Sequence, residues 1–204
     1  LVSFDGDNAA NATDADLTIN TTGASSGTVS IGAVSDVGTL TITQSGGTTF
    51  SSTLTAATLA ITDTADSQAV SLTGNVTLTT GLTTANGGSD NYNVSLTGGT
   101  NSIAGATTFN QGGTLTLGDG ADATDFVGGL VATAPSSISA QGTVKADTGT
   151  GVLTLGDSDT GLTVAGDLLI HDNPALCQSL IDAFIASCTI AGAVQNICCN
   201  AGGC

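Results

Sequence analysis

One short phrase recurs along most of this chain and limits what the chain can fold into. In each copy an apolar residue alternates with Thr or Ser, and Gly, Asn or Asp marks the adjoining turn. The clearest copies are DLTIN from Asp16, GTVSIG from Gly27, GTLTIT from Gly38, ATLAIT from Ala57, AVSLTG from Ala69, NVSLTG from Asn93, GTLTLGD from Gly113 and GVLTLGD from Gly151. Alternation with period two is typical of short β-strands that bury one face, because successive side chains point to opposite sides of a sheet. We therefore predict an all-β fold with Thr and Ser on its solvated outer faces.

Two all-β architectures fit strands at this spacing: an antiparallel β-sandwich and a parallel β-solenoid made of stacked coils. Self-similarity separates them, because a solenoid strand stacks on its own copy in the next coil, whereas each sandwich strand has different neighbours. TLTLGD from Thr114 and LTLGD from Leu153 are nearly identical. We therefore predict a parallel β-solenoid (β-helix) over residues 1–170, with roughly 20–25 residues per coil, and the sandwich remains the alternative.

The charge balance of the chain excludes several kinds of partner. Asp and Glu together number 17 against a single Lys or Arg, and the net charge is −16. Charged residues nevertheless make up only 9% of the chain and the mean hydropathy is +0.32, so the chain is expected to fold. Because an acidic surface repels phosphates, we expect no nucleic-acid partner, and anionic membranes are disfavoured. With aromatic residues at 3%, the core is predicted to consist of small aliphatic side chains.

Two stretches of the chain carry a family resemblance. TFSSTLTAATLAITDTADSQAVSLTGNVTLTTGLTTANGG from Thr49 and GATTFNQGGTLTLGDGADATDFVGGLVATAPSSI from Gly105 resemble the degenerate repeats of giant bacterial surface proteins. These are the filamentous-haemagglutinin-like and autotransporter-type adhesins. The resemblance spans about Thr49 to Ile170, and it implies a β-helix exposed on a bacterial cell surface.

The chain is expected to be secreted, extracellular or exposed on a cell surface. It starts with neither an initiator Met nor a signal segment, which is typical of a processed chain. The adjacent Cys198 and Cys199 favour an oxidising compartment. No apolar run approaches the roughly 18 residues of a membrane span.

A change of period separates a second segment, residues 171–204, which we expect to form a helical, Cys-rich C-terminal cap. Asn173 can cap a helix, and Pro174 suits the first helical position. The residues that follow at helical spacing are Leu176, Cys177, Leu180, Ile181, Phe184, Ile185 and Cys188. We predict an amphipathic helix from about Pro174 to Cys188 that covers the last coil of the solenoid.

All the cysteines lie in this cap, and their number is odd. They are Cys177, Cys188, Cys198, Cys199 and Cys204. On one helix Cys177 and Cys188 would stand about 16 Å apart along the axis, beyond the limit of about 7 Å for a disulfide. Each is therefore predicted to pair with a cysteine of the tail, with the connectivity open and one thiol left over. A zinc site is disfavoured because there is no CxxC pair and His171 is the one histidine.

The acidic opening DGDNAANATDAD is a candidate calcium site. Its candidate ligands are Asp5, Asp7, Asn8, Asp14 and Asp16. The segment lacks the Gly and the terminal Glu of an EF-hand loop, so ordinary Asp-rich turns are the competing interpretation. Similar clusters occur over Gly118–Asp125 and Gly156–Gly161. No other cofactor is expected.

No catalytic site is predicted. His171 has no Ser or Cys partner that the sequence can place beside it, and there is no P-loop or dinucleotide-binding motif. A polysaccharide-cleaving enzyme on the same scaffold is the least favoured hypothesis, because the single lysine, Lys145, leaves little to bind acidic sugars.

The function that fits best is an extracellular structural protein that assembles with itself. The ends of a solenoid are open strand edges that can template another chain. The apolar N-terminal residues Leu1, Val2, Ser3 and Phe4 are the predicted assembly segment, giving a head-to-tail homopolymer in a fibre, sheath or matrix. An adhesin module that binds a glycan or a protein is the alternative.

Overall fold

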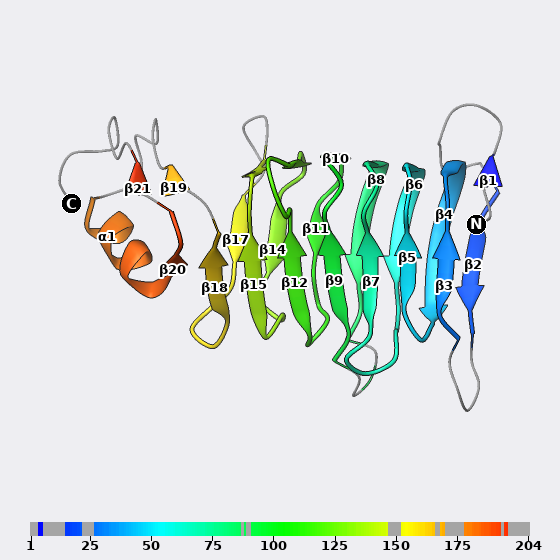
Figure 1. The fold of residues 1–204 in the computed structure, drawn as a ribbon, viewed down its shortest axis with the longest axis horizontal. Coiled ribbons are helices and arrows are strands. Elements are labelled where there is room, and N and C mark those ends of the chain that lie inside the picture. The colour runs from blue at the N-terminus through cyan, green and yellow to red at the C-terminus, as the bar shows by residue number, and fades with distance from the viewer. Residues whose placement is uncertain are drawn as a thin grey trace.

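The computed structural model describes residues 4–5, 15–21, 27–86, 88, 91–146, 152–165, 168–169, 178–192 and 194–195. Within these ranges the chain winds into a parallel β-solenoid of about six turns, seen from the side in Figure 1. Every pairing between described strands is parallel, which confirms the predicted solenoid and shows that the alternative sandwich was wrong.

Each coil contributes in turn to three faces, of which the first is one eight-stranded sheet, here called face 1. Its strands are β3 (Val29–Ile31), β5 (Thr48–Phe50), β7 (Ala69–Leu72), β9 (Asn93–Leu96), β12 (Thr114–Leu117), β15 (Ser137–Ala140), β18 (Gly161–Val164) and β20 (Thr189–Ile190). Their pairings follow one another without a register shift. Face 1 is therefore the most regular side of the molecule.

The other two faces belong to one eleven-stranded sheet, because three long strands run round the corner between them. These strands are β4 (Val34–Gln44), β6 (Leu54–Ile61) and β8 (Val76–Thr84). Their first parts form face 2 with β1 (Phe4–Asp5), β10 (Thr100–Ile103), β13 (Ala123–Phe126) and β16 (Thr143–Lys145). Their second parts form face 3 with β2 (Leu17–Asn20), β11 (Thr107–Thr108), β14 (Leu130–Ala132) and β17 (Leu153–Leu155). The register shifts at this corner, where Asp36 takes a φ of 52°.

Coil length varies along the stack. Hydrogen bonds between side chains in successive coils join residues from 19 positions apart, as between Ser45 and Thr64, to 27 positions apart, as between Thr84 and Gln111. The extra residues lie in the connections and at the register shifts within the long strands. This range brackets the predicted coil length, and it is why no single period describes the sequence.

Aliphatic side chains in stacked columns fill most of the interior. Leu17, Leu40, Leu59 and Leu82 pair in four successive coils, and the last three are fully buried. The core also contains four of the six aromatic side chains, whereas small aliphatic side chains were expected to fill it. Phe50, Tyr92, Phe109 and Phe126 are among the largest fully buried residues, and the rings of Phe109 and Phe126 meet edge to face with centroids 6.3 Å apart.

Polar side chains are buried at the corner between face 3 and face 1, which sequence analysis missed. Thr48 Oγ1 donates to Ser45 Oγ at 3.0 Å, and Thr84 Oγ1 donates to Gln111 Oε1 at 2.7 Å. Tyr92 donates its hydroxyl proton to the carbonyl oxygen of Ala85 at 2.6 Å. Burial raises the pKa of Tyr92 far above its usual value, so this phenol stays a donor. The bond between Thr84 and Gln111 joins two successive coils, whereas the other two satisfy buried polar atoms within one coil.

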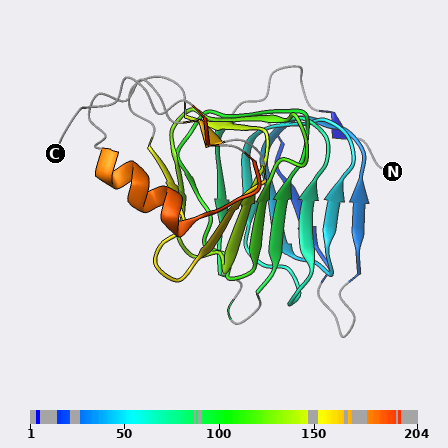
Figure 2. The same cartoon turned by 60° about the vertical axis from the view of Figure 1, so that its left-hand side comes forward.

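The C-terminal segment contains helix α1 (Gln178–Ser187) and then continues the stack. The helix lies within the predicted range, whose residues 174–177 fall outside the described part of the chain. After α1, β20 pairs with β18, and β21 (Val194–Gln195) pairs with β19 (Leu168–Leu169). In chain order α1 takes the place of a face-3 strand, because it lies between β19 and the face-1 strand β20. The helix lies at the end of the stack opposite β2 (Figures 1 and 2). No described helix is long and apolar enough to cross a membrane. The division at residue 170 remains a prediction.

Candidate functional site

The clearest surface feature is a single row of hydroxyl groups along face 1, here called the hydroxyl column. One Ser or Thr from each of the eight strands stands opposite the next. The column consists of Ser30, Thr49, Ser71, Ser95, Thr116, Ser139, Thr163 and Thr189. In each strand the neighbouring apolar side chains point inward, so the period-two alternation places the hydroxyl outside.

The hydroxyl column is uncharged, and its hydroxyls are not used inside the molecule. The eight strands of face 1 contain no Asp, Lys or other charged residue. No hydroxyl of the column has a hydrogen-bond partner among the described residues. Hydroxyls at the corner between faces 1 and 2, by contrast, do bond to the backbone. Ser51 Oγ donates to the carbonyl oxygen of Ile31 at 3.2 Å, and Thr73 Oγ1 donates to the carbonyl oxygen of Phe50 at 3.1 Å. The hydroxyls of the column are therefore free of bonds to the described part of the chain and face the solvent.

Face 2 presents no comparable row. Its outward column runs through Thr55, Thr77, Ser102, Asp125 and Lys145, so it ends in charged residues. Lys145 Nζ lies 3.3 Å from Asp125 Oδ2, and both side chains are partly exposed. Such an exposed ion pair contributes little to stability.

The outward column of face 3 is interrupted by apolar residues. It consists of Thr18, Thr41, Ala60, Thr83, Thr108, Val131 and Thr154. Ala60 and Val131 break the row of hydroxyls, and Val131 is 42% exposed. The unbroken hydroxyl row is thus a property of face 1 among the described faces.

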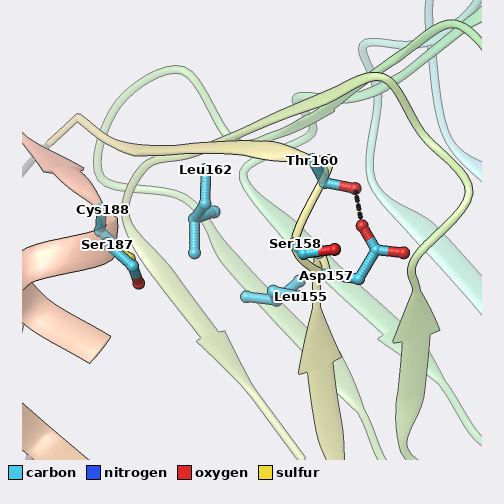
Figure 3. Close-up of a pocket in the computed structure, with 8 residues that line it drawn as sticks. Leu155, Asp157, Ser158, Thr160, Leu162, Ser187 and Cys188 are labelled. Atoms are coloured by element: carbon cyan, nitrogen blue, oxygen red, sulfur yellow. Dashed lines mark hydrogen bonds between the residues drawn. The ribbon is translucent and has the colours of Figure 1, made fainter. Parts of the chain in front are cut away.

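A pocket of about 300 Å³ opens between the last coil and the end of α1. Leu155, Leu162 and Cys188 stand around it, with Asp157 and Thr160 on the turn before β18 (Figure 3). The turn is held internally, since Asp157 Oδ1 accepts hydrogen bonds from Asp159 N at 3.0 Å and Thr160 Oγ1 at 3.1 Å. These bonds hold the pKa of Asp157 below its usual value. The carboxylate is therefore already used as a turn-forming group.

The second Asp-rich cluster also forms a turn. Asp119 N donates to Asp122 Oδ2 at 2.8 Å. The hydrogen bond between the two carboxyl groups, followed by desolvation and their like charge, raises the pKa of Asp119. No group of three side chains that could hold a metal ion occurs among the described residues.

The candidate calcium ligands are only partly described. Asp16 Oδ1 accepts a hydrogen bond from Thr39 N at 2.8 Å, so it joins the first coil to the next. Asp5 contributes backbone to β1, whereas Asp7, Asn8 and Asp14 lie outside the described residues. Because three of the five candidate ligands are not described, the structure does not test the calcium site, which remains a prediction.

The cysteine pairing also remains a prediction. Cys188 follows α1 and is partly buried; it has no disulfide partner within the described part of the chain, and Ser187 Oγ lies 3.8 Å from its Sγ. Cys177, Cys198, Cys199 and Cys204 lie outside the described residues, as does His171. Of the predicted assembly segment, Phe4 lies in β1, paired with Val34, and Leu1, Val2 and Ser3 are not described.

No protein-family model, curated protein or solved structure matches this chain.

Proposed function

We propose that this chain is an extracellular structural protein whose copies join end to end into a fibre, sheath or matrix. The supporting observation is the uninterrupted stack. Two sheets, of eight and eleven strands, follow its length, and the parallel pairings between coils run along the long axis. A rod held by backbone hydrogen bonds in the direction of its length suits a load-bearing or spacing role.

Strand edges at the start of the stack are the proposed joints. β1, β2 and β3 each pair with one later strand, so a second edge of each faces away from the described stack. Such edges present unpaired N–H and C=O groups that can accept another chain. A contact between the start of one stack and the end of another is heterologous, and it generates a filament when its rotation does not close.

The proposal includes a secreted or cell-surface location and no enzymatic activity. The resemblance to bacterial surface adhesins and the cysteine-rich tail support that location. A glycan-binding adhesin module remains the competing function.

Blocking the first strand tests this proposal. We expect the intact chain to form uniform filaments in negative-stain electron micrographs, and we expect deletion of Leu1–Gly6, or Phe4→Lys, to give monomers with an unchanged β circular dichroism signal. A lysine on an edge strand opposes pairing with another chain. Thr83→Lys is the matched control, because Thr83 is exposed on β8 in the middle of face 3, away from both ends. Filaments that survive both N-terminal changes would refute the joint, and monomers that bind a glycan array would favour the adhesin module.

A further inference from the structure

We propose that face 1 binds the surface of ice crystals through the hydroxyl column. Three properties of that face support the proposal: the repeat of its hydroxyls, their lack of partners among the described residues and the absence of charge. The proposal does not depend on filament formation.

The repeat of the column is set by the backbone. Parallel strands lie about 4.8 Å apart, so eight hydroxyls form a straight row about 34 Å long. The pairings along face 1 show no register shift, unlike those of β4 and β6 at the corner between faces 2 and 3. Six of the eight side chains are half-buried, which restricts their rotamers. The side chains of the row therefore lose little conformational entropy when the face binds.

Face 1 carries no charged residue, although the chain has a net charge of −16. The outward column of face 3 is also uncharged, but Ala60 and Val131 interrupt its hydroxyls. A charged side chain keeps a tightly held hydration shell, whereas a hydroxyl can both donate and accept within a water lattice. Equivalent water molecules in hexagonal ice repeat at a spacing close to that of β-strands. The hydroxyls of several successive coils can thus occupy positions that water molecules would take in the lattice of a growing ice surface.

Two other occupants fit face 1 less well. The face measures on the order of 400 Å², about half of what each partner buries in a standard protein interface, and its hydroxyls offer little hydrophobic gain. Aromatic side chains that could stack on sugar rings are also missing, because Phe50, the one aromatic of these strands, is fully buried. A second copy of the chain and a polysaccharide are therefore disfavoured.

The test measures thermal hysteresis and inhibition of ice recrystallisation with the whole chain. We expect both activities in the intact protein, and we expect Thr116→Tyr to lower the hysteresis at least five-fold, because a ring in the middle of the row holds the face away from the ice. Thr116→Ser should retain most of the activity, since Ser occupies four positions of the column. Thr83→Tyr, an exposed position in the middle of face 3, is the matched control and should behave as the intact protein does.

Circular dichroism and the melting temperature show whether each variant folds, and Ser71→Tyr replaces Thr116→Tyr if the latter does not. The proposal is overturned if the intact chain has neither activity, or if Thr83→Tyr loses as much as Thr116→Tyr. It is also overturned if Thr116→Tyr instead dissolves a dimer or abolishes binding to a polysaccharide.

Discussion

Leu59 illustrates how the interior of the stack depends on single side chains. It is fully buried and stacks between Leu40 and Leu82 of the neighbouring coils. Each coil has only a few inward positions, so a lost side chain leaves a cavity that the backbone ladder cannot close. Leu40 and Leu59 occupy the apolar positions of the repeated phrases GTLTIT and ATLAIT, so the period-two pattern agrees with their burial.

We expect Leu59→Ala to lower the free energy of unfolding by about 2–5 kcal/mol, the usual range for truncating a buried leucine. Val131→Ala, at a 42% exposed position, should change it by less than about 0.5 kcal/mol. Urea titration followed by circular dichroism measures both. Equal effects of the two substitutions would mean that the Leu59 column is not the core.

Helix α1 is the element that departs from the stack, and it also constrains the disulfides. Its residues Gln178–Ser187 separate Cys177 from Cys188, and ten helical residues span about 15 Å. A disulfide requires Cα atoms within about 7 Å. The pocket beside Cys188 leaves its thiol accessible from the direction of the last coil.

Peptide mapping of the oxidised chain under non-reducing conditions should therefore recover Cys188 linked to Cys198, Cys199 or Cys204, and no link between Cys177 and Cys188. The reduced, alkylated protein is the control for peptide recovery. Recovery of a Cys177–Cys188 peptide would contradict the helix between them.

On the scale of the whole molecule, charge opposes the proposed assembly. Each copy carries a net charge of −16, and at 0.01 M salt the Debye length of about 30 Å leaves copies repelling one another, whereas at 0.15 M it falls to about 8 Å. Filaments should therefore lengthen as sodium chloride rises over this range, as measured by electron microscopy and light scattering.

Calcium chloride at matched ionic strength is the control for this experiment. A greater effect of calcium than of sodium would support the site predicted from Asp5 to Asp16, and an equal effect would assign the response to screening alone. A chain that stays monomeric at every salt concentration would refute end-to-end assembly.

The sequence by itself determined the strands and the helix near the C-terminus, and its near-identical copies favoured the solenoid over the sandwich. The strands and the helix follow from local periodicity: Leu59 and Ile61 alternate with Thr58 and Ala60, and Ile181 and Ile185 repeat at helical spacing. Such patterns depend on neighbours in the chain and can be read without coordinates.

Only the tertiary structure decided which outward residues share a face. Coils differ in length because their connections differ, so Ser95 meets Thr116 and Ser71 only through the register of the stacked strands. The stacking of the coils also places Asp125 opposite Lys145 on face 2, and it buries Ser45 and Gln111 at the corner between faces 3 and 1. Local alternation places a hydroxyl outside, but hydrogen bonding between coils aligns eight of them, and that alignment is a long-range property.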